Sequence, residues 1–343
     1  MASSTTPRAL DQLVRDGLSS LVFAFGYQTG IVDAFINVRQ PCTAEELSQK
    51  AGKKLRYIQE WLGCLVAAGI VTINEEGKYS LPFETNQLKL WGHISTVIPI
   101  LSQIFPQLQN AVSHEGPEGF WYSEPFLSWI NTSHSQEDLD QWSKQFLAPV
   151  LKLKPGCKFT ILDFGCGYGR HTRAMAKQYP DSKIYAFDMD QVSISYANKE
   201  LSKDGPKNIE YLCKRGGQLP DDWSEKFDFI IINDVLHDSF EVDAILEEIK
   251  RVIKPDGFAV AFDPAVSSYH RNLINDKEAQ LHLPFSFFTC LPTSSINSSK
   301  EGLGVGWGYE RRKQKIKDHG FRVVQVGDKD IDTIQEGIVF QKL

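Results

Sequence analysis

The chain has 343 residues, of which 42% are hydrophobic and 23% charged, and its formal net charge at pH 7 is -6. This composition is typical of a folded globular protein and excludes the fibrous and disordered classes. The negative charge argues against a protein whose main task is to bind nucleic-acid phosphates. No apolar stretch reaches the ~20 residues of a membrane span, and the start lacks a secretory signal pattern. We therefore expect a cytoplasmic protein that binds neither nucleic acid nor a membrane.

The six cysteines form no CxxC pair, and the histidines show no HxxH or HExxH spacing. Both patterns mark metal sites in many proteins. The sequence therefore predicts reduced thiols, no disulfide framework and no metal site.

Residues 8–36 predict two helices, because apolar side chains recur there at helical spacing. Gly26 and Gly30 are expected to mark a bend between the two helices. We expect the apolar side chains of the first helix to pack in a core: Leu10, Leu13, Val14, Leu18, Leu21 and Val22.

Residues 41–81 show the pattern of a winged helix, with two helices followed by a hairpin. Thr43 and Glu46 have the spacing of a capping box at the start of the first helix. Basic and acidic residues balance in this region, and the presumed reading helix carries only Arg56 beyond its start. Since a DNA-reading helix needs several basic or amide side chains, the pattern favours dimerisation or a scaffold role. A DNA-binding regulator stays the alternative.

From residue 158 onward, strands alternate with helices, which predicts a parallel sheet with crossover helices. Seven strand segments can be distinguished, and the last two have the pattern of an antiparallel hairpin. The predicted fold class is α/β, with a doubly wound, Rossmann-like, mostly parallel seven-stranded sheet and an N-terminal helical winged-helix domain. We divide the chain into a winged-helix or dimerisation domain (1–85), a helical linker and substrate lid (86–150), and a ligand-binding α/β domain (151–343).

The segment from Asp163 to Gly169, DFGCGYG, ends the first strand and opens a helix. Its GxGxG spacing differs from the GxGxxG of dinucleotide sites, which place a pyrophosphate at the helix N-terminus. The carboxylate of Asp163 would repel a pyrophosphate but suits the ammonium of an amino-acid cofactor. Asp188, at the end of the next strand, can bind both ribose hydroxyls, and Met189 can cover an adenine. The pattern favours S-adenosylmethionine over NAD.

The segments LDFGCGYG, AFDMD and FDFIIINDVLHD resemble class I S-adenosylmethionine-dependent methyltransferases. The segments TAEELSQKAGKKLRYIQEWLGCLVAAGIV and FFTCLPTSSINSSKEGLGVGWGYERRKQKIKDHGF are similar to a branch with an N-terminal winged helix, typified by an uncharacterised mycobacterial methyltransferase. This branch is related to the plant-type O-methyltransferases. The resemblance covers nearly the whole chain.

The resemblance implies the cofactor contacts. Asp163, Gly165 and Gly167 would line the methionine portion, Asp188 the ribose and Met189 the adenine, and Asn233 would lie near the sulfonium. The sequence departs from the family pattern at residues 214–217, KRGG, where many class I enzymes have an acid for the adenine amino group. A backbone contact would have to replace that acid here.

His237 follows Asn233 by four residues. In plant-type O-methyltransferases a similar LHD histidine is the general base, so the resemblance implies this role for His237, with Asp238 orienting the ring. An imidazole suits the role because its unperturbed pKa lies near the working pH. The alternative is that His237 caps the following helix or contacts the cofactor.

These observations predict S-adenosylmethionine-dependent methyl transfer to an oxygen or nitrogen of a small-molecule acceptor by a homodimer. Such a reaction mainly requires placement of the nucleophile and removal of water. The N-terminal helices and residues 281–308 are expected to form the lid, and the aromatic loop 114–122 is a candidate lining for a pocket that takes a flat apolar acceptor. The alternatives are a DNA-binding regulator that senses the cofactor and a catalytically silent cofactor-binding scaffold.

Overall fold

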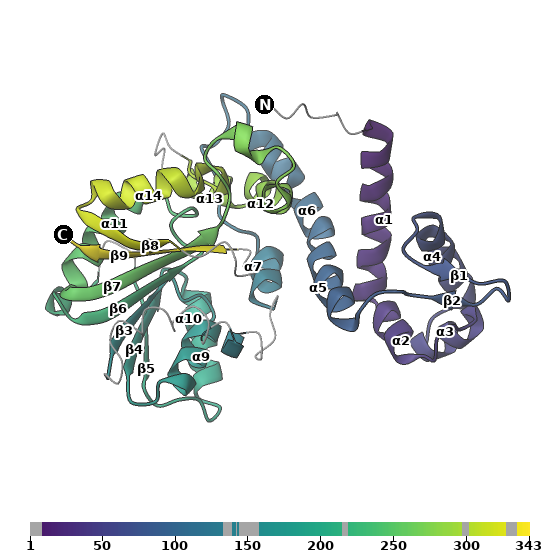
Figure 1. The fold of residues 1–343 in the computed structure, drawn as a ribbon, viewed down its shortest axis with the longest axis horizontal. Helices are drawn as coiled ribbons and strands as arrows, with labels where there is room; N and C mark the ends of the chain where they lie inside the picture. Colours follow the sequence, from purple (N-terminus) through teal and green to yellow (C-terminus); the bar gives the residue numbers. More distant parts are fainter. Residues whose placement is uncertain are drawn as a thin grey trace. The chain divides into compact units, whose positions relative to one another are not determined.

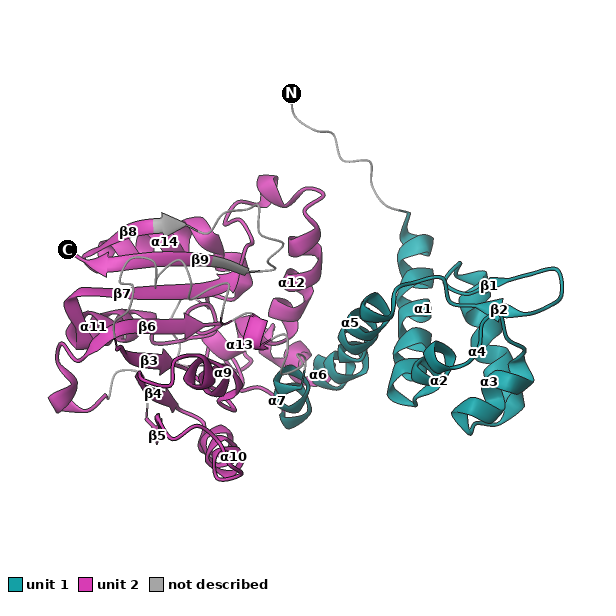
Figure 2. Cartoon of the chain, turned by 60° about the horizontal axis from the view of Figure 1, so that its bottom comes forward, with its two compact units in different colours: residues 1–105, 124–133 teal, residues 106–123, 134–343 magenta. Residues whose placement is uncertain are grey.

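The computed structural model of the chain describes residues 9–132, 139–141, 143, 158–214, 219–296, 302–326 and 335–343. The expected domain boundary at 150/151 and residues 215–217 of the KRGG segment lie outside these ranges. The chain divides into two compact units, residues 1–105 with 124–133 and residues 106–123 with 134–343 (Figure 2). In the described part, no single helix is long and apolar enough to cross a membrane, although one bent helix pair, Leu10–Gln28 with Ile31–Asn37, passes a test of length and composition.

The first unit is helical with a short hairpin (Figure 1). Its elements are α1 (Leu10–Gln28), α2 (Ile31–Asn37), α3 (Ala44–Ala51), α4 (Leu55–Ala67), β1 (Thr72–Ile73), β2 (Tyr79–Ser80), α5 (Thr85–Ser95), most of α6 (Val97–Ala111) and α7 (Glu124–Asn131). The order of α3, α4 and the β1–β2 hairpin is that of a winged helix, as predicted. The predicted capping box is present as well, because Thr43 Oγ1 accepts the N–H of Glu46 at 3.2 Å and Glu46 Oε2 accepts the N–H of Thr43 at 2.7 Å.

The prediction that the apolar side chains of α1 pack in a core is wrong for most of them. Val22 packs against the core of the unit. The other five side chains are 43 to 78% exposed: Leu10, Leu13, Val14, Leu18 and Leu21. Phe25, on the same side of the helix, is also exposed. Helical spacing shows that these side chains share one side of the helix, but not whether the same chain covers that side.

Gly30 marks the bend between α1 and α2, as predicted, and its φ of 79° lies in the left-handed region. Gly26 does not. It lies inside α1, where a Cβ would come within 2.4 Å of Nε1 of Trp61. Gly26 is therefore a packing position that lets α1 approach α4.

The second unit contains a seven-stranded sheet in the order β5-β4-β3-β6-β7-β9-β8. The five strands from β5 to β7 are parallel, and β9 runs antiparallel to both β7 and β8. This confirms the predicted mostly parallel sheet. The strands are β3 (Thr160–Phe164), β4 (Lys183–Asp188), β5 (Ile209–Cys213), β6 (Phe227–Asn233), β7 (Ile253–Pro264), β8 (Phe321–Val326) and β9 (Gln335–Lys342).

Helices cover both faces of the sheet, as a doubly wound fold requires (Figure 1). Successive strand residues point to opposite faces. Leu162 and Ile230 pack on the face that holds α11 and α14, whereas Ile161 and Ile231 pack with Met175 of α9 on the other. The helices are α9 (Arg170–Gln178), α10 (Gln191–Leu201), α11 (Val242–Val252), α12 (Lys277–Phe288), α13 (Cys290–Ser294) and α14 (Gly308–Asp318).

Strand order determines where a ligand can bind. The chain passes from β3 to β4 and β5 on one side and then to β6 and β7 on the other. Ligands of doubly wound sheets bind at the carboxyl ends of the strands where this direction reverses. That point lies between β3 and β6, so the loops after these strands form the expected site.

The capping box gives a test of the winged-helix region. Thr43→Ala removes the side-chain acceptor at the start of α3 and should lower local stability by about 1 kcal/mol. Where amides exchange through local opening, this loss should make exchange roughly fivefold faster. Hydrogen exchange resolved over residues 41–81 measures this. Gln49→Ala, an exposed change in the same helix, is the control and should change little. Equal exchange in both variants would show that the cap contributes nothing.

Candidate functional site

The glycine-rich loop after β3 leads directly into α9. Gly165, Gly167 and Gly169 have φ values of 77°, 52° and 66°, a region that residues with a Cβ rarely adopt. A Cβ on Gly165 would lie 2.4 Å from Cγ2 of Val235, and one on Gly169 would lie 2.3 Å from the hydroxyl oxygen of Tyr211. Backbone conformation and packing therefore both require glycine at these two positions.

Asp188 ends β4 and connects it to this loop. Its Oδ2 accepts the N–H of Gly167 at 2.8 Å, and its Oδ1 accepts the N–H of Asp190 at 2.9 Å. Burial raises the pKa of the Asp188 carboxyl, while these two N–H groups lower it. A carboxylate oxygen has two lone pairs, so each oxygen of Asp188 retains one for a bound diol.

Asp163 lies near the end of β3 and is only 3% exposed. The hydroxyl of Thr172 donates to its Oδ2 at 2.5 Å. Burial raises the pKa of Asp163 to about 7, although the Thr172 hydrogen bond lowers it. A buried carboxyl that titrates near neutrality gains strongly from a cationic neighbour, because the neighbour compensates the cost of the buried negative charge.

Met189 and Asn233 occupy the ends of two strands of the same sheet. Met189 follows β4 and is 39% exposed, so its side chain is accessible to a ligand. Asn233 ends β6, and its Nδ2 donates to Oδ2 of Asp234 at 3.3 Å. Its Oδ1 is buried and accepts no hydrogen bond from the described residues. Since buried polar atoms normally have a partner, this oxygen fits a ligand that donates a hydrogen bond. The cofactor contacts of these residues stay predictions.

His237 is held between two carboxylates. Its side chain is almost fully buried, with Nδ1 hydrogen-bonded to Oδ1 of Asp263 and Nε2 lying 3.0 Å from Oδ1 of Asp238. Because an ionised carboxylate only accepts, Nδ1 carries a proton. Burial opposes the charged imidazolium, but Asp238 and Asp263 outweigh it and raise the pKa of His237 well above its usual value. His237 is thus built to hold a proton firmly.

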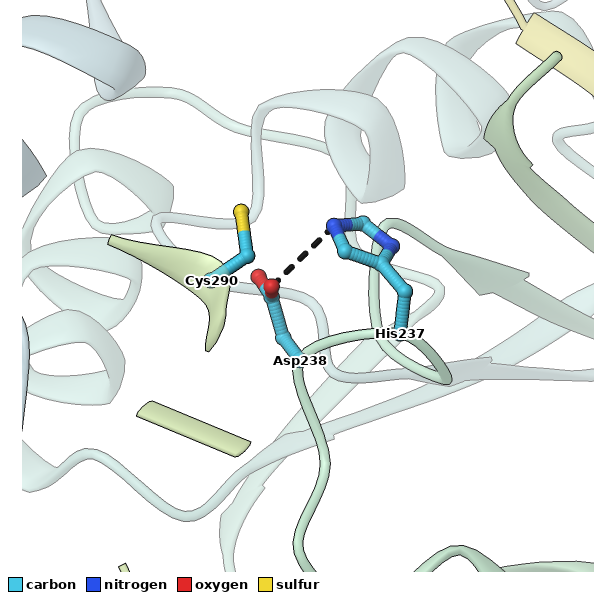
Figure 3. Close-up of side chains that lie close together, drawn as sticks. All are labelled: His237, Asp238 and Cys290. Atoms are coloured by element: carbon cyan, nitrogen blue, oxygen red, sulfur yellow. Dashed lines mark ion pairs between the residues drawn. The ribbon is translucent and has the colours of Figure 1, made fainter. Parts of the chain in front are cut away.

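The expected lid segments within the second unit do reach this histidine. The hydroxyl of Tyr122 donates to Oδ2 of Asp238. Cys290, at the start of α13, lies beside His237 and Asp238 (Figure 3). The two segments also bind each other, because the N–H of Phe120 donates to the carbonyl of Pro292 at 3.1 Å. The aromatic loop and α13 therefore enclose the His237–Asp238 pair.

Asp263 is the main site residue that the sequence analysis missed. It is the second-last residue of β7, is fully buried, and its Oδ2 lies 3.6 Å from Nε of the buried Arg312. The signal was available, because β6 and β7 are neighbouring parallel strands and their carboxyl ends meet. Asn233 pairs in register with Phe262, the residue before Asp263. Tyr122, Cys290 and Arg312 come from separate segments and gave no such signal.

Comparison with known proteins agrees with the geometry. Residues 156–304 match a family model described as a methyltransferase domain, and residues 17–89 match an Rv2258c-like winged HTH domain. A demethylmenaquinone methyltransferase of Lactobacillus johnsonii is 32% identical over 135 residues, which cover 39% of this chain and 54% of that protein. A myricetin O-methyltransferase of Catharanthus roseus is 27% identical over 239 residues, covering 62% of this chain and 63% of that protein. The chain thus spans about half of the first relative's length.

Solved structures share the fold over the whole chain. An O-methyltransferase-like protein of Nostoc punctiforme has a TM-score of 0.74 and 17% identity, covering 99% of this chain and 100% of that one. Human N-acetylserotonin methyltransferase in complex with S-adenosylmethionine has a TM-score of 0.66 and 18% identity, covering 100% of this chain and 99% of that one. Both domain matches, the glycine loop and the strand order agree: the chain carries a methyltransferase domain at residues 156–304 behind an Rv2258c-like winged helix at residues 17–89, and it shares the fold of these solved methyltransferase structures.

Proposed function

We propose that this protein transfers a methyl group from S-adenosylmethionine to a small-molecule acceptor, at an oxygen or nitrogen and preferably at a hydroxyl oxygen. The observation that carries this proposal is the carboxylate-held His237 at the same sheet edge as the glycine loop. A hydroxyl must lose its proton to become a good nucleophile, and a positioned imidazole can take it. The aromatic loop 114–122, which lies beside Asp238, fits a flat acceptor. The likeness to a myricetin O-methyltransferase supports a hydroxyl as the methylated group.

The cofactor supplies a methyl group on a positively charged sulfur. In this proposal Asp163 lies near its ammonium, with Gly165 and Gly167 along the methionine portion and Asp188 at the ribose hydroxyls. Met189 covers the adenine, and the unpartnered Oδ1 of Asn233 lies near the sulfonium. The residues present fit this ligand, because the glycines leave space for it and the acids suit its cationic and hydroxyl groups.

Within this site, His237 accepts the acceptor's proton on Nε2 while Asp263 fixes the ring through Nδ1. Asp238 and Asp263 stabilise the imidazolium that forms, in keeping with the direction in which they move the pKa of His237. The enclosing loop and α13 exclude water, which strengthens these interactions. The rest of the catalysis is placement of the nucleophile.

The exposed apolar side of α1 supports a homodimer. A stripe of this kind on one helix is typical of a surface that another chain covers.

The proposed division of the chain has residues 1–85 for dimerisation, 86–150 as linker and lid, and 151–343 as the catalytic domain. We place the protein in the cytoplasm. Arg56, the lone basic residue within α4, is ion-paired with Glu60. This gives little support to phosphate binding, so we propose a small-molecule partner rather than DNA.

Incubation with isotopically labelled S-adenosylmethionine and a panel of hydroxylated aromatic compounds should yield labelled product. His237→Gln should lower kcat/KM by roughly 100-fold to 10,000-fold while leaving cofactor binding intact by calorimetry. Retained activity in this variant would contradict a base at this position. Absence of label transfer to the panel and to a metabolite extract would overturn the enzymatic proposal.

The pH profile tests the carboxylates around His237. Because the base must be neutral and its pKa lies well above the usual value, kcat/KM should rise with pH through and above neutrality. Asp238→Asn removes a negative charge, lowers the pKa of His237 and should move the rising limb to lower pH. A limb that stays in place or moves to higher pH would exclude His237 as the titrating base.

Asp163 gives a separate pH dependence in cofactor binding. Its pKa of about 7 belongs to the unliganded protein. If the ionised form binds the ammonium, affinity for S-adenosylhomocysteine should increase between about pH 6 and 7.5, below the pKa of the ligand's α-amino group. Calorimetry across this range measures it. Asp163→Asn should bind more weakly and lose the increase, and an unchanged slope in that variant would place the ammonium elsewhere.

The dimer is tested by placing a charge in the apolar stripe. Leu18 is 62% exposed, so Leu18→Glu should leave the monomer folded but weaken association by roughly 100-fold or more, because a buried unpaired charge is costly. Sedimentation measures the change. Gln12→Lys adds a charge beside Asp16 on the polar side of α1 and should remain dimeric. A wild-type monomer at micromolar concentration would contradict the proposal.

A further inference from the structure

We propose that His237, Asp238 and Cys290 form a binding site for one thiophilic divalent cation, for which zinc is the natural probe. Donor atoms of these three side chains all lie within 4.8 Å of one another. The separation of 3.0 Å between Nε2 of His237 and Oδ1 of Asp238 is close to the roughly 3.3 Å expected for two ligands at ~2.0 Å on a tetrahedral ion.

The three side chains come from two segments and lie close together (Figure 3). His237 and Asp238 follow β6, whereas Cys290 begins α13 and is only 9% exposed. Oδ1 of Asp238 is buried and forms an ion pair with Nε2 of His237 at 3.0 Å. A cation between the three side chains would replace this ion pair and bind both of its atoms.

The residues behind these ligands orient them as in many metal sites. A metal-binding histidine usually donates its second ring N–H to a carboxylate, which fixes the tautomer and directs the other nitrogen at the ion. Asp263 does this through Nδ1 of His237. Tyr122 donates to Oδ2 of Asp238 and so leaves Oδ1 for the cation. Both supporting contacts are already in place.

The donor set identifies the class of ion. One imidazole nitrogen, one carboxylate oxygen and one thiolate suit zinc, whereas magnesium and calcium prefer oxygen ligands alone. Three protein ligands leave the fourth tetrahedral position for water or a substrate atom. A second grouping, Asp234 with His237 and Asp263, fits less well, because its histidine nitrogen is already hydrogen-bonded to Asp263 and it has no sulfur.

Electrical balance also permits the ion. Bound zinc would carry two positive charges, matched by Asp238 and the Cys290 thiolate, while Asp263 faces the guanidinium of Arg312 at 3.6 Å. On binding, the thiol proton and any proton on Nε2 pass to solvent as the metal–sulfur and metal–nitrogen bonds form. The environment of the site therefore contains no uncompensated buried charge.

Binding has a consequence for methyl transfer, and this part rests on the proposed function. The ion would occupy Nε2, the nitrogen that takes the proton from the acceptor. Zinc should therefore inhibit the reaction, and a chelator should restore it.

The binding site is tested on the full chain without any acceptor. After treatment with a chelator, titration with cobalt(II) should produce a thiolate-to-cobalt charge-transfer band and the visible bands of a tetrahedral ion at one equivalent, and zinc should displace them. Cys290→Ser should abolish the charge-transfer band and weaken binding by at least about 100-fold. Cys64→Ser, at an exposed thiol of α4, should keep it. Calorimetry with S-adenosylhomocysteine checks that each variant is folded.

Absence of the charge-transfer band in the wild-type chain would overturn the proposal, as would its persistence in folded Cys290→Ser. The spectrum tests the cation site and the methyl-transfer assay tests the proposed function, so either proposal can be overturned without the other. A cobalt band in a chain that methylates no acceptor would keep the cation site and overturn the function, and full activity at saturating zinc would overturn inhibition through Nε2.

Discussion

The chemistry of the site depends on the buried hydrogen bond between Asp263 and Nδ1 of His237. A carboxylate with no exposure to water is costly unless it is paired, and here a protonated ring nitrogen and a guanidinium 3.6 Å away share that role. The bond fixes the ring and directs Nε2 toward Asp238. Because Asp263 lies within β7, an interior strand of the sheet, its backbone is held by the strands on both sides.

The same sheet edge explains why the glycine loop and His237 lie together. β3, β4, β6 and β7 are parallel neighbours, so the glycine loop, Asp188, Asn233 and Asp263 all follow carboxyl ends. The close approach of Gly165 to Val235 joins the loop after β3 to the loop that carries His237. Any side chain at residue 165 would push these loops apart and, in the proposed mechanism, would separate the methyl donor from the base.

Local patterns in the sequence were sufficient for the elements of the sheet, the winged helix and the loop from Asp163 to Gly169, because periodicity and glycine spacing act over few residues. Local patterns were insufficient where the contact partner of a side chain lies far away in the sequence or on another chain. The apolar stripe of α1 follows the spacing of a core helix, yet most of it is exposed. Asp263 could have been inferred from strand adjacency. Cys290 could not, because it reaches His237 only through the path of α12 and α13.

Tyr122 links acceptor enclosure to the base. Its hydroxyl binds one oxygen of Asp238 while the other oxygen faces Nε2 of His237. Burial and the negative charge of Asp238 raise the pKa of Tyr122 well above its usual value, so the hydroxyl keeps its proton and remains a donor. If the loop moved away, Asp238 would lose this donor and hold the imidazolium more tightly. The hydrogen bond from Tyr122 thus weakens the hold of Asp238 on the proton of His237 and, in the proposed mechanism, favours the neutral imidazole.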